Sequence, residues 1–162
     1  MIAKRFFLLV GQLIVGLAMV PEAVLFGAVG TLPFLGDVLT ARAGRDIWGP
    51  GQTYARSMVV ASFAVDAAAV LCLISAVLLM WKPSRRGVWL SIAGTTCYWT
   101  FIVANMGMML SLPHGRRIGL TIWDGADYLL GFVSALVTFG LYSYTRTGLF
   151  SSDTSQPQPK VS

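Results

Sequence analysis

Four long apolar stretches, separated by more polar segments, dominate the chain. They cover residues 6–29, 57–81, 87–112 and 127–145, and each is close to the roughly 20 residues that a helix needs to cross a hydrocarbon core of about 30 Å. A helix also satisfies its backbone hydrogen bonds internally, which lipid requires. The pattern therefore predicts an all-α integral membrane protein, built as a four-transmembrane-helix antiparallel bundle with a long first loop.

The connections between the apolar stretches predict the topology. The second connection, Lys82 to Arg86, is so short that the helices on either side must be antiparallel neighbours. The first, residues 30–56, is long and glycine-rich, and we expect it to lie outside the hydrocarbon core because unpaired backbone cannot face lipid. Residues 1–150 are thus predicted to form a single transmembrane domain. Residues 151–162, rich in Ser, Gln and Pro, are predicted to be a disordered tail.

Composition supports the membrane interpretation. Of the 162 residues, 56% are hydrophobic and only 12% are charged, whereas a soluble domain is about half apolar and about a quarter charged. The net charge of +5 comes from basic residues that lie mostly between the apolar stretches. Because no basic run is interleaved with aromatic residues, we interpret this charge as a contact with the lipid bilayer and exclude nucleic acid as a partner.

The same basic residues predict the orientation. Cytoplasmic loops carry an excess of Lys and Arg, and seven basic residues lie on the side of the two termini against five on the other side. We therefore expect a multi-pass integral membrane protein, in the inner membrane if the cell is bacterial, with both termini in the cytoplasm. The first group is Lys4, Arg5, Lys82, Arg85, Arg86, Arg146 and Lys160, and the second is Arg42, Arg45, Arg56, Arg116 and Arg117.

Acidic residues inside the apolar stretches are the strongest functional signal. An acid at the bilayer centre costs about 2.5–3.5 kcal/mol even on the lenient insertion scale. At about 1.5 Å per residue, Glu22 lies about 10 Å, Asp66 about 13 Å and Asn105 about 10 Å below the helix ends nearest the first loop. Asp127 is expected at the start of the fourth helix on that side. We therefore predict a polar pocket in one leaflet, in which Glu22 and Asp66 lie side by side.

Further residues are expected to line this pocket. Tyr98 and Asn105 share one stripe of the third helix, and Asp124 and Asp127 begin a small, polar stripe on the fourth, which is typical of faces that pack on other helices. The catalytic candidates are Glu22, Asp66 and Asp127. The ligand-binding candidates are Tyr98, Trp99, Asn105, Asp124, Trp48 and Trp123.

Each candidate also has a structural interpretation. Glu22 and Asp66 could form a structural pair bonded to Tyr98, Asn105 or the backbone freed by Pro21. Asp124 and Asp127 could cap the fourth helix. Asn105 could be a bond between helices, and Trp48 and Trp123 could be anchors at the membrane interface.

Three classes of function follow from these residues, although no motif in the chain identifies a reaction. The first is an enzyme or binder for a lipophilic small molecule, of isoprenoid, quinone, polyketide or sterol-like class, with one acid protonated and its neighbour acting as base. The alternatives are a non-catalytic structural or assembly subunit with a membrane-protein partner or a second copy, and a proton-coupled carrier. In size and topology alone the chain resembles the emopamil-binding-like sterol isomerases and the anthrone-oxygenase-like proteins. No motif accompanies that resemblance, so it assigns no functional role to any residue of this chain.

We expect no cofactor and no metal. The chain has one histidine, which cannot supply paired-histidine haem ligation or the usual zinc ligands. It also has no glycine-rich phosphate loop, no nucleophile elbow and no HExxH motif, which argues against nucleotide-dependent chemistry.

Overall fold

The computed structural model describes residues 2–32, 34–35, 53–81, 84–111 and 121–147. These residues form helix α1 (Ile2–Phe26) with a following π-helical turn η1 (Gly27–Thr31), and helices α3 (Thr53–Trp81), α4 (Arg85–Ser111) and α5 (Thr121–Thr147). Within the described part of the chain, four helices are long and apolar enough to cross a membrane. The predicted all-helical fold with four helices of spanning length is therefore confirmed.

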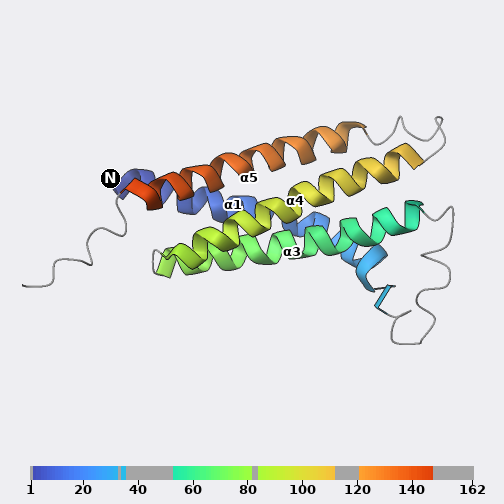
Figure 1. Cartoon of the computed structure of the whole chain (residues 1–162), viewed down its shortest axis with the longest axis horizontal. Coiled ribbons are helices and arrows are strands. Elements are labelled where there is room, and N and C mark those ends of the chain that lie inside the picture. Colours follow the sequence, from blue (N-terminus) through green and yellow to red (C-terminus); the bar gives the residue numbers. More distant parts are fainter. Residues whose placement is uncertain (1, 33, 36–52, 82–83, 112–120, 148–162) are drawn as a thin grey trace, which may run out of the picture.

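The four helices run side by side as a bundle (Figure 1). Helices α3 and α4 form the most extensive contact, as the short connection between them predicts, and α1 packs mainly on α3. Helix α5 contacts both α4 and α1. The beginning of α1 and the end of α5 lie at the same end of the bundle, opposite the beginnings of α3 and α5 (Figure 1).

The surface of the bundle is apolar, while part of its interior is polar. Phe7 exposes 80% of its surface and Trp81 exposes 89%, and many more large hydrophobic side chains point outward. Large contiguous apolar surfaces are rare on soluble monomers, so this exterior suits lipid. The buried polar and charged side chains are Gln12, Ser62, Ser75, Ser91, Thr95, Asp127, Ser134 and Thr138.

The helices extend past the boundaries that the apolar stretches predict. Helix α3 begins at Thr53 rather than at 57, and α5 begins at Thr121 rather than at 127. Asp127 therefore lies in the second turn of α5, and the prediction that it starts the helix is wrong. Hydrophobicity marks only the part of a helix inside lipid, whereas the helical backbone can continue into the more polar interface. The predicted disordered tail and most of the predicted loops lie outside the described residues.

The first helix changes its geometry near its end. Helix α1 continues through Pro21, and regular α-helical geometry ends at Phe26, where the π-helical turn η1 follows. Gly30 in this turn lies against Ser62 of α3 so closely that a β-carbon at that position would overlap the serine hydroxyl. A π-helical turn often marks a functional position in a helix.

Small residues allow α3 and α4 to approach closely. A β-carbon on Gly94 would lie 2.7 Å from Sγ of Cys72 and 3.2 Å from its backbone nitrogen. Nearer the connection between the two helices, the hydroxyl of Ser75 donates a hydrogen bond to the carbonyl oxygen of Gly87 at 2.7 Å. Close backbone approach and interhelical hydrogen bonds are the contacts that hold helices together in lipid.

Candidate functional site

A glutamate, an aspartate and a tyrosine from three helices meet inside the bundle. The phenol of Tyr98 on α4 donates a 2.9 Å hydrogen bond to Oε2 of Glu22 on α1. The carboxyl group of Asp127 on α5 lies close enough to Glu22 to interact with it electrostatically, and we call these two residues the acid pair. Tyr98 is fully buried, Asp127 is 8% exposed and Glu22 is half-buried.

The acid pair has a chemical consequence. A carboxylate can only accept hydrogen bonds, whereas a protonated carboxyl group can also donate one. A hydrogen bond between two carboxyl groups therefore requires a proton on one of them. When the two carboxyl groups of the acid pair share one proton, they offer a proton donor beside a proton acceptor.

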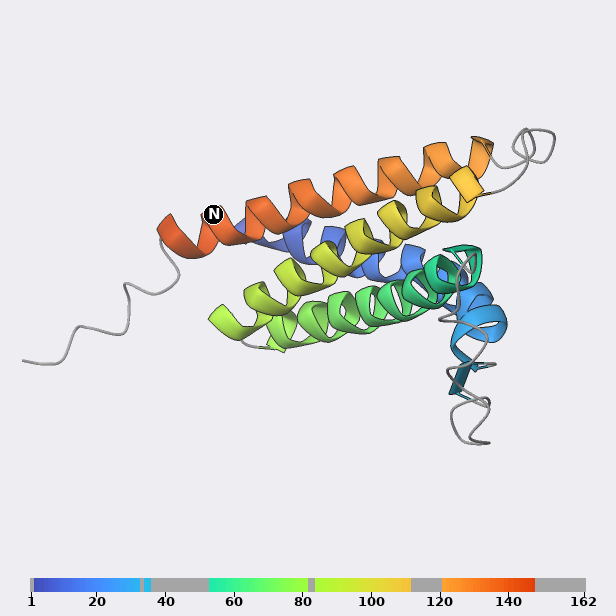
Figure 2. The same ribbon diagram turned by 45° about the vertical axis from the view of Figure 1, so that its right-hand side comes forward.

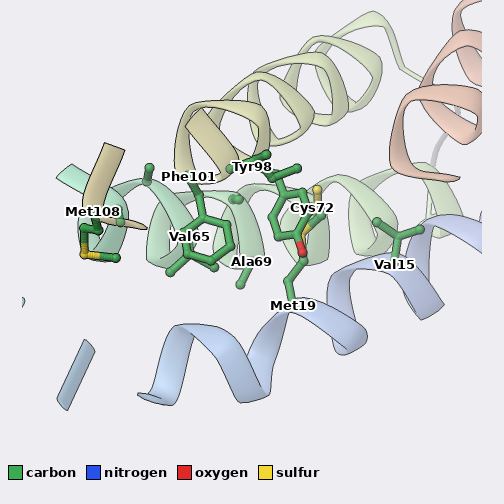
Figure 3. Packing of buried hydrophobic residues seen from close by; sticks show 12 residues of the cluster. Val15, Met19, Val65, Ala69, Cys72, Tyr98, Phe101 and Met108 are labelled. Atoms are coloured by element: carbon green, nitrogen blue, oxygen red, sulfur yellow. The ribbon is translucent and has the colours of Figure 1, made fainter. Parts of the chain in front are cut away.

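Aromatic side chains hold the tyrosine in place. The rings of Tyr98 and Phe101 lie 5.5 Å apart, and Phe101 meets Phe26 of α1 edge to face at 5.0 Å. Tyr98 points from α4 toward α1 and lies near Met19 and Cys72 (Figure 3). Because packed aromatic rings restrict one another's rotation, the phenol oxygen is fixed within reach of Glu22.

Asn105 joins the same site from α4. Its amide Nδ2 lies 3.5 Å from Oδ2 of Asp127, a long hydrogen bond. Asn105 is seven positions, or two helical turns, beyond Tyr98, so the two side chains share one face of α4. The polar side chains of this face thus contact both members of the acid pair.

Asp66 does not pair with Glu22 as the sequence predicts. Its Oδ2 accepts a 2.7 Å hydrogen bond from the hydroxyl of Thr31, and its Oδ1 would lie 3.3 Å from a β-carbon on Gly27. Asp66 thus faces the π-helical turn, about 7.5 Å farther along the first helix than Glu22, while Asp127 is the acid that acts electrostatically on Glu22. The expected Glu22–Asp66 contact is therefore corrected to a Glu22–Asp127 contact. A role for Asp66 in the site stays a prediction.

Of the tryptophan candidates and Asp124, the structure describes only the side chain of Trp99. Trp99 is 37% exposed, and its ring lies against Gly131 of α5, where a β-carbon would be 3.5 Å away. Trp123 and Asp124 belong to the first turn of α5, but their side chains lie outside the described part, as does all of Trp48. Their assignment to the site stays a prediction.

A second polar cluster lies in the bundle interior, and the sequence indicates it only in part. Ser91 donates to Oε1 of Gln12 at 3.0 Å and is 2.8 Å from the hydroxyl of Thr138. Thr138 is 2.9 Å from Thr95, which in turn is 2.7 Å from Ser134. We call these five residues the hydroxyl chain. Ser91 shares the predicted stripe of Tyr98 and Asn105, and Ser134 and Thr138 share the stripe that Asp127 begins, whereas no stripe predicts Gln12 or Thr95.

The direction of the hydroxyl chain follows from proton counting. Each hydroxyl has one hydrogen to donate, and Ser91 gives its hydrogen to Gln12. Thr138 must then donate to Ser91, Thr95 to Thr138 and Ser134 to Thr95. Aligned hydrogen bonds of this kind strengthen one another in a medium of low dielectric constant. The chain links α1, α4 and α5 and, through a 3.5 Å contact from the Gln12 amide to the Cys72 carbonyl, α3.

Within the described residues, no group of three or more His, Cys, Asp and Glu side chains is arranged to hold a metal ion. The acid pair supplies two carboxyl groups, and Tyr98 and Asn105, which contact it, are neutral. The fold and this site together define a helical bundle with an apolar exterior and an internal pair of acids. No protein-family model, curated protein or solved structure matches this chain.

Proposed function

We propose that the protein binds a lipophilic small molecule beside the acid pair and acts on it by acid–base chemistry. The observation that carries the proposal is that two acids from different helices, Glu22 and Asp127, lie near the buried phenol of Tyr98 inside the bundle. Burying an acid among apolar helices costs free energy, so acids in such positions mark candidate functional sites. Paired acids in one site are a recurring means of placing a proton donor beside an acceptor.

The surroundings of Glu22 favour a lipophilic ligand. Glu22 is only half-buried, and its neighbours Val24 and Leu25 are 67% and 62% exposed on the apolar exterior. A molecule that reaches Glu22 from the acyl chains meets hydrocarbon surface before it meets the carboxyl group. Isoprenoids, quinones, polyketides and sterol-like molecules have this combination of an apolar body and few polar groups.

An isomerisation illustrates the chemistry that the acid pair supports. The protonated acid adds its proton to one carbon of a double bond, and the ionised acid removes a proton from the carbon attached to the other end of that double bond, so that the double bond moves by one position. The pair ends with the same number of protons as it began with. Tyr98 donates to one oxygen of Glu22 and leaves the other oxygen for proton exchange.

The test compares ligand retention and stability in two variants of the acid pair. In Glu22→Gln and Asp127→Asn, a side-chain amide replaces the acid without changing its size. We expect gently extracted wild-type protein to retain a small lipophilic molecule in native mass spectrometry, and both variants to lose it while their melting temperatures in detergent change by only a few degrees. Asp153→Asn, in the predicted tail, is the control for the loss of one charge.

The opposite outcome would favour the assembly-subunit alternative. If the two variants lose a co-purifying protein, or do not fold, while no small molecule is found on the wild type, then the acid pair is a structural bond between helices. The proposal would then fail.

A further inference from the structure

A lipid-facing groove separates α4 from α5 at the end of the bundle opposite the acid pair site. The two helices lie close together where α4 ends and α5 begins, and they diverge toward the beginning of α4 (Figure 2). The groove between them has a volume of about 410 Å³. Ile92, Ala135 and Phe139 contribute apolar walls, and Thr95 and Thr138 of the hydroxyl chain also line it.

The groove continues into a cavity with basic residues. This cavity has a volume of about 270 Å³ and shares Trp89 and Tyr142 with the groove. Arg85, from the first turn of α4, and Arg146, from the last turn of α5, also line it. One continuous surface thus combines two guanidinium groups, two amphipathic aromatic rings and an apolar body, in this order along the bundle.

We propose that this groove binds an anionic phospholipid of the surrounding bilayer. The lipid phosphate lies between Arg85 and Arg146, and one acyl chain lies along the groove between α4 and α5. Guanidinium groups match the geometry of phosphate oxygens, and basic pockets between membrane helices on the cytoplasmic side recognise anionic headgroups. Trp89 and Tyr142 lie between the arginines and the apolar walls, as side chains at the headgroup level commonly do.

The dimensions fit one leaflet. From Arg146 to Ala135 the groove follows eleven residues of α5, which is about 16 Å at the rise of an α-helix. That length is about half of the roughly 30 Å hydrocarbon thickness of a bilayer. A lipid with its phosphate at the arginines therefore extends its acyl chain along the groove to about the level of the bilayer centre.

Charge favours a lipid over a second copy of the chain as the occupant. An apolar helix in the groove would cover the guanidinium group of Arg146 without supplying negative charge, and covering a charged group in that way is unfavourable. An anionic headgroup supplies the charge, and its acyl chain covers the apolar walls. The proposal does not depend on the acid pair, which lies near the other end of α4 and α5.

The first experiment measures lipid selectivity at the arginines. The full-length protein in detergent is titrated with phosphatidylglycerol or phosphatidylcholine, and native mass spectrometry measures the fraction with bound lipid. We expect the wild type to prefer phosphatidylglycerol, and we expect this preference to fall about fivefold in each of the single variants Arg85→Gln and Arg146→Gln. Arg86→Gln is the matched control, because Arg86 is exposed beside Arg85 but does not line the cavity.

The second experiment blocks the acyl chain. Ala135→Trp fills the groove, whereas Leu136→Trp adds the same ring at a neighbouring position that is 55% exposed and lines neither part of the groove. We expect only Ala135→Trp to reduce phosphatidylglycerol binding. Equal binding of the two lipids, or equal losses in Arg86→Gln and the other arginine variants, would overturn the proposal. A dimer that Ala135→Trp dissociates would overturn it too, because a second copy would then cover the groove.

Discussion

The hydroxyl group of Tyr98 donates its hydrogen to Oε2 of Glu22 across 2.9 Å, between residues that are 76 positions apart in the chain. This bond joins α4 to α1 directly beside the acid pair, and it places a fully buried phenol against a carboxyl group. Its loss leaves a carboxyl oxygen without its donor in surroundings that contain little water.

Removing the tyrosine hydroxyl should therefore destabilise the bundle. We expect Tyr98→Phe to lower the free energy of unfolding in detergent by about 1–2 kcal/mol, the upper range for hydrogen bonds between membrane helices. The control is Tyr128→Phe, at a tyrosine of α5 that is 37% exposed, for which we expect a change within about 0.5 kcal/mol. Equal effects of the two substitutions would contradict the hydrogen bond between Tyr98 and Glu22.

The hydroxyl chain should show energetic coupling between α4 and α5. Ser91→Ala and Thr138→Val each remove a hydroxyl from the pair that lies 2.8 Å apart. In a double-mutant cycle measured by unfolding in detergent, we expect a coupling energy of about 0.5–1.7 kcal/mol. Thr100→Val in place of Thr138→Val is the control, because the Thr100 hydroxyl bonds to the carbonyl oxygen of Thr96 in its own helix. A coupling energy near zero between Ser91 and Thr138 would contradict their hydrogen bond in the hydroxyl chain.

Gly94 should tolerate no side chain. Gly94→Ala places a β-carbon 2.7 Å from Sγ of Cys72, so α3 and α4 must separate, and we expect a loss of about 1–3 kcal/mol in the free energy of unfolding. Gly125→Ala is the matched control on α5. It meets no atom within 4 Å, and the higher helix propensity of alanine should stabilise the helix by up to about 1 kcal/mol. An unchanged or higher free energy of unfolding in Gly94→Ala would show that the contact between Gly94 and Cys72 is not tight.

The hydrogen bond from Thr31 to Asp66 should hold the π-helical turn. Thr31→Val removes the donor of this 2.7 Å bond, and a loss of about 1 kcal/mol corresponds to a roughly fivefold larger population of the locally open backbone. Hydrogen exchange followed by mass spectrometry should detect the change in the peptide that spans Gly27–Thr31. Thr96→Val, which removes a bond within α4, should leave exchange in that peptide unchanged. If both variants behave alike, Thr31 does not anchor the turn.

The partners of the acids could not be deduced from their depths. Counting residues along each helix places Glu22, Asp66, Asn105 and Asp127 at similar levels, but depth says nothing about the direction in which a side chain points. A rotation of α3 by a fraction of a turn decides whether Asp66 faces Glu22 or Thr31, and the packing of Ser62 against Gly30 fixes that rotation. Asp127 reaches Glu22 because α5 lies beside both α1 and α4.

The sequence by itself determined the number of long helices, their approximate ranges and the residues that carry buried polarity. It could do so because apolar length and helical periodicity are local properties of the chain, and lipid leaves few alternatives for the backbone. Only the tertiary structure decided that Glu22 meets Asp127, that Gln12 and Thr95 complete the hydroxyl chain, and that α4 and α5 diverge to form a groove. These features depend on how the helices are ordered and rotated about their axes, which contacts between distant residues such as Gly94 and Cys72 fix.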